Sequence, residues 1–279
     1  MIMNKVISNP LSKEYDELFM ANISQFNNAA TKRDKEYCAF YPSFGSEGKK
    51  FEFIIYGQAI KGWKPRFKTT DQIKDKDFLK ESIEHSNSFY SDGKKDNHSP
   101  LDWVNFRWSR GAYKELCNTG NTYYDDQDWG DYFAFRSFFW NVTYKLIARY
   151  YGLDENGHDW TKKIVWSNLY KIAPAERQNP SEEECVWQRE KSVELVKKEI
   201  AEIRPKYCIV LTNDDWWSSF RRNSEKLQTK KIKGIKKSYE YVQSYEQYPG
   251  SDTRIVVTKR PFTGGKSNIC VNEILETIK

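Results

Sequence analysis

The stretch FIIYGQAIKGW at residues 53–63 runs from an apolar segment into a loop that two glycines flank. Aromatic and β-branched residues dominate positions 51–56, which predicts a buried strand that delivers its carboxyl end to this loop. Three later runs have the same character and predict strands at 163–169, 207–211 and 255–258. A strand pair near the edge of a sheet is expected over 230–245.

Helical periodicity separates these strands, because apolar residues recur every three or four positions between them. The segment NPSEEEC at 179–185 opens one helix, since Ser181 can cap it and Glu184 stands three residues later, as in a capping box. Pro205 ends that helix. Further helices are expected at 11–27, 77–85, 132–151, 214–227 and 268–278.

Strands that alternate with helices form parallel βαβ units. The sequence therefore predicts a single α/β domain over residues 1–279, with a polar insertion at about 68–128. Its architecture would be a three-layer α/β/α sandwich with a short, mainly parallel four-stranded central sheet. Ligands on such sheets bind beyond the carboxyl ends of the strands, so the candidate site is formed by the loops 57–67, 168–178 and 259–267.

The composition sets limits on function. Aromatic residues make up 16% of the 279 residues, so large rings can supply a core despite the low aliphatic content. The net charge of +6 is mildly basic and compatible with a polyanionic partner. No apolar run reaches the roughly 20 residues that span a bilayer, and residues 1–10 lack the apolar segment of a secretion signal.

The five cysteines are scattered and form no Cys-x-x-Cys pair, which argues against zinc and iron–sulfur sites. A reducing compartment is the simplest explanation for this usage. No Gly-rich Walker loop, Ser-His-Asp arrangement or His-rich metal motif is present in the sequence. We therefore expect a cytoplasmic protein with no metal, no cofactor and no membrane partner.

One long segment, residues 165–211, combines a strand that ends in Asn with a Lys-x-x-Pro turn, an Asn-Pro helix start and a Pro-Lys entry to the next strand: VWSNLYKIAPAERQNPSEEECVWQREKSVELVKKEIAEIRPKYCIVL. This order resembles the uracil-DNA glycosylase superfamily. YGQA at 56–59 is similar to the first motif of that superfamily, and VTKRPFTGGKSN at 257–268 stands where its His-Pro-Ser loop belongs. The resemblance covers residues 51–63, 163–212 and 254–279.

Several positions depart from the superfamily pattern. Ala59 replaces the water-activating Asp of a Gly-Gln-Asp-Pro motif, and Ile60 replaces its Pro. Arg260 stands where the superfamily has a catalytic His. Cys185 matches one position of the cluster-bearing members, but Ile172 occupies another, so no iron–sulfur cluster is expected.

Asn168 is the candidate base-recognising residue, because a carboxamide offers a donor and an acceptor together. The resemblance implies that it recognises a flipped base, as the Asn of the superfamily recognises uracil. Gly57 would let the backbone approach the ligand, with Ala59 beside it, and Gln58 would hold a water molecule. The alternative for Asn168 is an ordinary residue that turns the chain after a strand.

Arg260 carries a permanent charge that can stabilise a departing base anion or bind a backbone phosphate. Trp63 or Phe67 could stack on a base, which contributes roughly 1–3 kcal/mol per base. Phe262 could wedge into a duplex. The alternatives are an Arg260 that is only solvated and rings that belong to the core.

Basic and small residues in the first and last of these loops suggest contacts with nucleic acid. Basic side chains alternate with rings after the first strand, and a helix start, which binds phosphate readily, follows the last strand. The candidate nucleic-acid-binding residues are Lys61, Lys64, Arg66, Gly264, Gly265, Lys266 and Ser267. A second basic run at 226–237 is more simply a solvated face or a guarded sheet edge. The carboxylates at 125–131 indicate a helix N-terminus.

Three hypotheses remain open. The first is a divergent uracil-DNA glycosylase-like protein that binds DNA or a nucleobase-containing ligand, with Gln58, Asn168 and Arg260 as catalytic residues if it hydrolyses the N-glycosidic bond of a damaged or deaminated base. The second is a catalytically inactive nucleic-acid- or nucleobase-binding module of the same fold, which Ala59 and Arg260 favour. The third is an unrelated α/β protein. A structure in which residues 57–60, 168 and 260 do not converge would decide for the third.

Overall fold

The structure is a computed structural model, and its description covers most of the chain. The described residues are 11–31, 33–46, 50–60, 62–69, 73, 75–87, 100–101, 104, 137–157, 159–176, 179–222, 228–232, 234–260 and 266–279. Most of the predicted insertion at 68–128 and the carboxylates at 125–131 lie outside these residues. The same holds for four candidate site residues, Lys61, Phe262, Gly264 and Gly265.

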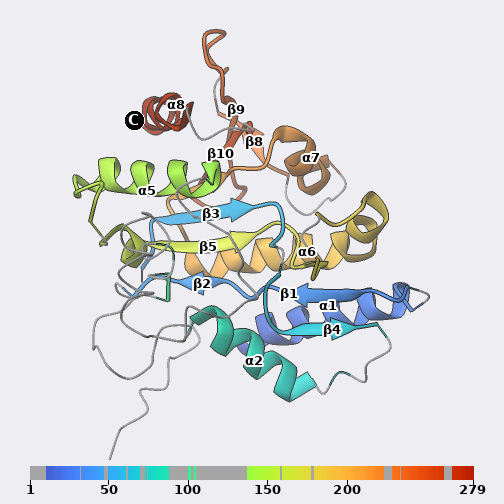
Figure 1. The fold of residues 1–279 in the computed structure, drawn as a ribbon. Coiled ribbons are helices and arrows are strands. Elements are labelled where there is room, and N and C mark those ends of the chain that lie inside the picture. The colour runs from blue at the N-terminus through green and yellow to red at the C-terminus, as the bar shows by residue number, and fades with distance from the viewer. Residues whose placement is uncertain are drawn as a thin grey trace, which may run out of the picture.

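A seven-stranded sheet forms the centre of the fold, in the order β2-β5-β3-β7-β10-β9-β8 (Figure 1). Its four inner strands are parallel and match the four predicted from sequence: β5 (Ile164–Asn168), β3 (Phe53–Gly57), β7 (Tyr207–Val210) and β10 (Arg254–Thr258). Three antiparallel strands extend the sheet: β2 (Ser43–Phe44), β9 (Val242–Gln247) and β8 (Lys230–Lys231). The prediction of a four-stranded sheet is therefore wrong in strand number, because antiparallel strands extend the parallel core on both sides: β2 on one, β9 and β8 on the other.

Helices cover both faces of this sheet (Figure 1). On one face lie α1 (Lys13–Ala29), α6 (Glu182–Ile203) and α7 (Asp214–Arg222), and on the other α5 (Phe138–Tyr151) and α8 (Ser267–Ile278). The helix α2 (Asp75–Asn87) and the 3₁₀ helix η4 (Asp159–Lys163) complete the helices whose bounds can be stated. The molecule is thus a mixed α/β protein with apolar layers above and below one sheet.

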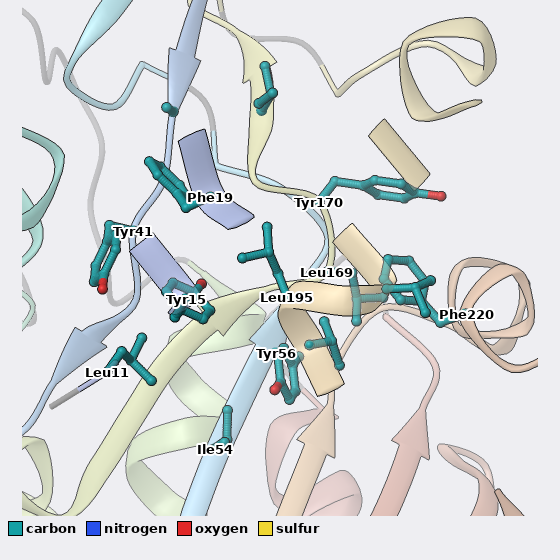
Figure 2. Close-up of a cluster of buried hydrophobic side chains, with 14 of the residues drawn as sticks. Leu11, Tyr15, Phe19, Tyr41, Ile54, Tyr56, Leu169, Tyr170, Leu195 and Phe220 are labelled. Carbon is teal, nitrogen blue, oxygen red and sulfur yellow. The ribbon is translucent and has the colours of Figure 1, made fainter. Parts of the chain in front are cut away.

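Side-chain alternation along the strands explains why both faces need a cover. Ile54 and Tyr56 point to the α1 and α6 side, whereas Phe53 and Ile55 point to the α5 and α8 side, as the period of two residues requires. Figure 2 shows the first of these layers, where rings from α1 and β3 surround Leu195 of α6. Because the strands are buried on both faces, they form continuous apolar runs in the sequence.

The start of α6 follows the sequence prediction closely. The Ser181 hydroxyl accepts a hydrogen bond from the Glu184 backbone N–H, and the Glu184 carboxylate accepts one from the Ser181 backbone N–H. This reciprocal capping box satisfies two backbone donors at the helix start. The helix ends at Ile203, two residues before Pro205.

A second, three-stranded antiparallel sheet has the order β4-β1-β6. It consists of β1 (Glu36–Ala39), β4 (Arg66–Lys68) and β6 (Ile172–Pro174). The segments 57–67 and 168–178 were predicted to be loops, but the first contains the start of β4 and the second contains β6. The strands are too short for a periodic signal, and only the pairing of both with β1 defines them.

The basic run near residue 230 lies at the edge of the large sheet. Lys230 and Lys231 form the exposed edge strand β8, which pairs with β9. The predicted strand pair near the edge is therefore confirmed. Charged side chains on an edge strand oppose pairing with another chain, which agrees with the structural interpretation of this run.

An aromatic cluster between α2 and the sheet encloses His85. Its ring lies 4.6 Å from the Trp63 ring, which in turn packs against Phe40 and Trp166. Burial, with a smaller contribution from the charge of Lys64, lowers the pKa of His85 to about 3. The folded protein therefore keeps this imidazole neutral over most of the acidic range.

We expect His85 to make the protein less stable as the pH falls from 6.5 toward 3. The unfolded chain takes up a proton near the ordinary histidine pKa while the folded chain does not, so the free energy of unfolding decreases on acidification. Between pH 7 and pH 5 the loss from this group is about 2 kcal/mol. Urea denaturation of wild type and His85→Gln at both pH values measures it, and an equal pH dependence in the two proteins would contradict the assignment.

Candidate functional site

The carboxyl ends of the four parallel strands meet at one edge of the sheet. In the pairing of β3 with β5, Gly57 stands opposite Asn168, so these two strands end level. Asn213 follows β7, and Arg260 follows β10. We call five polar residues at this edge the strand-end cluster: Gln58, Asn168, Asn213, Arg260 and Asn179, which precedes α6. Hydrogen bonds join Gln58 to Asn179 and Arg260, and Arg260 to Asn213.

Gln58 is the hub of this cluster. Its side-chain Nε2 donates to the backbone carbonyl of Thr212 at 3.1 Å. Its Oε1 accepts from Arg260 Nη1 at 2.5 Å and from Asn179 Nδ2 at 3.2 Å. Gln58 is 7% exposed, whereas Asn179 and Arg260 are exposed residues, so the bonds of Gln58 to them are only partly buried. The three bonds connect the ends of β3, β7 and β10 with the start of α6.

Arg260 crosses the end of β7 to reach Gln58, because β7 lies between β3 and β10 in the sheet. Its backbone N–H donates to Asn213 Oδ1. Asn213 has a backbone φ of 83°, a left-handed conformation that Asn adopts more readily than most residues. Two amide side chains, from Gln58 and Asn213, therefore hold the main chain and the guanidinium of Arg260.

Asn168 ends β5 at this edge and is 2% exposed. Its carboxamide oxygen lies on the α5 side of the sheet, where a Cβ at Gly57 would meet both it and Phe139. Among the described residues its side-chain Nδ2 finds no hydrogen-bond acceptor. A buried donor without a partner costs free energy, so such a group calls for an explanation by a ligand or by water. A Cβ at Gly57 would lie closer than 3.0 Å to Asn168 Oδ1, so only glycine leaves room for this carboxamide.

A buried ion pair contacts the backbone of Asn168 at the end of β5. Lys171 Nζ contacts Glu199 Oε1 at 2.7 Å, and both side chains are 0% exposed. The ammonium also donates to Ser167 Oγ at 2.7 Å and to the Asn168 backbone carbonyl at 2.6 Å. Tyr15 donates its hydroxyl to Glu199 Oε1 at 2.7 Å. Burial lowers the pKa of Lys171, although the charge of Glu199 opposes that shift.

The two candidate stacking rings belong to the core. Trp63 is 1% exposed within the aromatic cluster around His85, and Phe67 is 3% exposed and packs edge-on against Phe78. Neither ring presents a face to a ligand in this structure, so we assign the stacking role to neither. Ala59 is partly buried and packs against the hydrophobic layers of both sheet faces.

The described basic candidates have protein partners of their own. Arg66 on β4 pairs with Glu36 at 3.8 Å, and Lys266 pairs with Glu240 at 2.7 Å. Ser267 is buried as the first residue of α8, and its hydroxyl accepts from Lys145 at 3.0 Å. Lys64 is partly buried. Lys61, Phe262, Gly264 and Gly265 lie outside the described residues, and their predicted roles stay predictions.

Two members of the cluster were missed by the sequence analysis, although both left a signal. Asn179 is the Asn of the Asn-Pro pair that opens α6, and Asn213 follows a buried strand as Asn168 does. Of the two asparagines that follow a strand, only Asn168 was assigned a role from the sequence. A rule that treats every Asn or Gln directly after a predicted parallel strand as a candidate would have found Asn213.

The strand-end cluster is rich in hydrogen-bonding groups and carries one positive charge. Its four amides can donate and accept, and the guanidinium can only donate. No member of the cluster can accept a proton at neutral pH, so the cluster alone supports recognition better than general-base catalysis. Within the described part of the chain, no group of three His, Cys, Asp or Glu side chains is placed to bind a metal ion.

Comparisons with known proteins do not assign the chain to a family. A scan against protein-family models finds no match, and a search of curated proteins finds no match either. None of the helices in the described residues is long and apolar enough to cross a membrane.

We expect Gly57→Ala to destabilise the protein by about 1–3 kcal/mol, because the new methyl group would overlap the Asn168 carboxamide. Urea denaturation at neutral pH measures the change. Gly234→Ala is the matched control, since a Cβ there meets no atom within 4 Å, and it should change the stability by less than about 0.5 kcal/mol. Equal stabilities for the two variants would show that Gly57 is not needed for close packing.

Proposed function

We propose that this protein is a divergent uracil-DNA glycosylase-like α/β/α sandwich that binds DNA or a nucleobase-containing ligand at the strand-end cluster. The observation that carries the proposal is that β3, β5 and β10 bring Gln58, Asn168 and Arg260 to one edge of the sheet, where Arg260 contacts Gln58. The sequence resemblance names the same three positions, yet they stand far apart in the chain.

The chemistry of the cluster favours binding over hydrolysis. Gln58 stands beside Ala59, where the superfamily pattern has a water-activating Asp, and a carboxamide cannot take a proton from water. Its Oε1 already accepts two hydrogen bonds, and its Nε2 donates one to a backbone carbonyl. Gln58 therefore serves as a structural link as well as a polar group.

Asn168 and Arg260 have separate roles in this proposal. The buried Asn168 Nδ2 supplies a donor for a carbonyl oxygen of a base, and a good donor–acceptor match discriminates between bases. Arg260 supplies the charge for a phosphate or for a base anion. The guanidinium lies within hydrogen-bond distance of Gln58, which keeps hydrolysis with anion stabilisation as a second candidate function. The cytoplasmic location stays a prediction.

A binding experiment with labelled single-stranded oligonucleotides tests the proposal. We expect wild type to bind at low salt, and Asn168→Ala to weaken binding of the preferred base by roughly tenfold to a hundredfold, about 1–3 kcal/mol. Fluorescence anisotropy with uracil-, hypoxanthine- and xanthine-containing strands and an unmodified strand measures this. No binding to any of these strands at low salt would refute the proposal.

Arg260→Ala should weaken binding to all of these oligonucleotides by the same factor. It should also reduce the salt dependence of binding by about one phosphate contact. Arg254→Ala is the control, because Arg254 stands at the opposite end of the same strand, β10. Binding that survives in Asn168→Ala but fails in Arg260→Ala would indicate phosphate contact without base recognition. If Arg254→Ala loses as much affinity as Arg260→Ala, the loss comes from the lower net charge and not from a contact of Arg260.

The hydrolytic candidate needs its own assay. Each modified strand is incubated with the protein and treated with alkali, which cleaves at abasic sites. If wild type yields cleaved product from any of the three modified oligonucleotides and Arg260→Ala does not, N-glycosidic hydrolysis at this site is established. If none of the three strands yields product, binding alone remains as the function.

A further inference from the structure

Lys171 is a buried cation that the proposed binding role does not use. Its ammonium group has three N–H donors, and the structure gives it three acceptors: Ser167 Oγ, the Asn168 carbonyl and Glu199 Oε1, at 2.6–2.7 Å. Two of these acceptors belong to the last two residues of β5. The cation therefore acts on the end of the strand that carries the base-recognition candidate.

The peptide group between Asn168 and Leu169 is held at both of its polar ends. Its carbonyl accepts from Lys171 at 2.6 Å, and its N–H donates to the Gly57 carbonyl at 2.9 Å. Two hydrogen bonds on one peptide plane restrain its rotation, and with it ψ of Asn168 and φ of Leu169. Because the allowed side-chain rotamers depend on the backbone dihedrals, this restraint narrows the directions open to the Asn168 carboxamide.

We propose that Lys171 is a positioning residue that orients the Asn168 carboxamide for base recognition, an inference that rests on the proposed function of Asn168. Two further residues hold Lys171 in place: the Glu199 carboxylate contacts the ammonium group, and the Tyr15 hydroxyl donates to that carboxylate. This series of polar contacts connects α1 and α6 with the end of β5. Hydrogen bonds of this kind behind a contacting residue set its geometry.

The test needs a variant that folds without the ammonium. Lys171→Met alone would leave a buried carboxylate without its counter-charge, so we pair it with Glu199→Gln, which keeps an acceptor for Tyr15. Ile274→Ala is the matched control, because Ile274 is fully buried on α8 at the opposite face and its loss also destabilises the core. All variants are first compared by circular dichroism and urea denaturation.

The first readout is the side-chain amide resonance of Asn168 in the nitrogen-15 NMR spectrum, assigned with Asn168→Ala. We expect this resonance to shift or broaden in Lys171→Met/Glu199→Gln and to stay unchanged in Ile274→Ala. An unchanged resonance in the paired variant would overturn the positioning role. This measurement needs no ligand, so it decides the inference even if the proposed function fails.

The second readout is the affinity for a single-stranded oligonucleotide that carries one uracil. The paired variant should bind it about tenfold more weakly, the equivalent of one hydrogen bond, and Ile274→Ala should bind it as wild type does. In an Asn168→Ala background the same paired change should cause no further loss. An equal loss in both backgrounds would show that Lys171 acts on overall structure only. If wild type does not bind this strand, the proposed function fails while the NMR result still stands.

Discussion

The buried ion pair between Lys171 and Glu199 is the interaction on which the end of β5, and with it the position of Asn168, depends. It joins the turn after β5 to the C-terminal third of α6, and the Tyr15 hydroxyl extends it to α1. Breaking one side of such a pair costs about 3–5 kcal/mol, because the remaining charge stays buried without a partner. The pair therefore links the helical layer to the end of β5, and this link restrains the backbone that carries the Asn168 side chain.

The aromatic composition explains how the sheet can be buried on both faces with so few aliphatic residues. Trp63 and Trp140 both pack against Trp166 of β5, and Tyr15 and Phe19 fill the opposite layer with Tyr41. Edge-on ring contacts of this kind stabilise a core beyond the area they bury. Because the core is built mainly from aromatic side chains, Trp63 and Phe67, the two candidate stacking residues, are buried in it.

The strand-end cluster combines features of two candidate functions. Its position agrees with the general rule that ligands bind at the carboxyl edge of a parallel sheet. Its residue types, four amides and one guanidinium, suit the recognition of a planar polar heterocycle and an adjacent anion. The absence of a proton acceptor from these five side chains is what favours a binding module over an efficient hydrolase.

Much of the fold could be predicted from the sequence alone. The four parallel strands, the capping box at Ser181 and the order of the helices follow from local apolar patterns and side-chain hydrogen bonds between near neighbours. Asn168 could be predicted as a strand-end residue for the same reason. Pairing between distant segments leaves no such local trace, so the edge strand β2, the small sheet around β1 and the burial of Trp63 appear only in three dimensions. The contacts of Gln58 with Arg260 and of Lys171 with Glu199 were likewise decided by tertiary structure, because a hydrogen bond between residues far apart in the chain depends on where the folded backbone brings them.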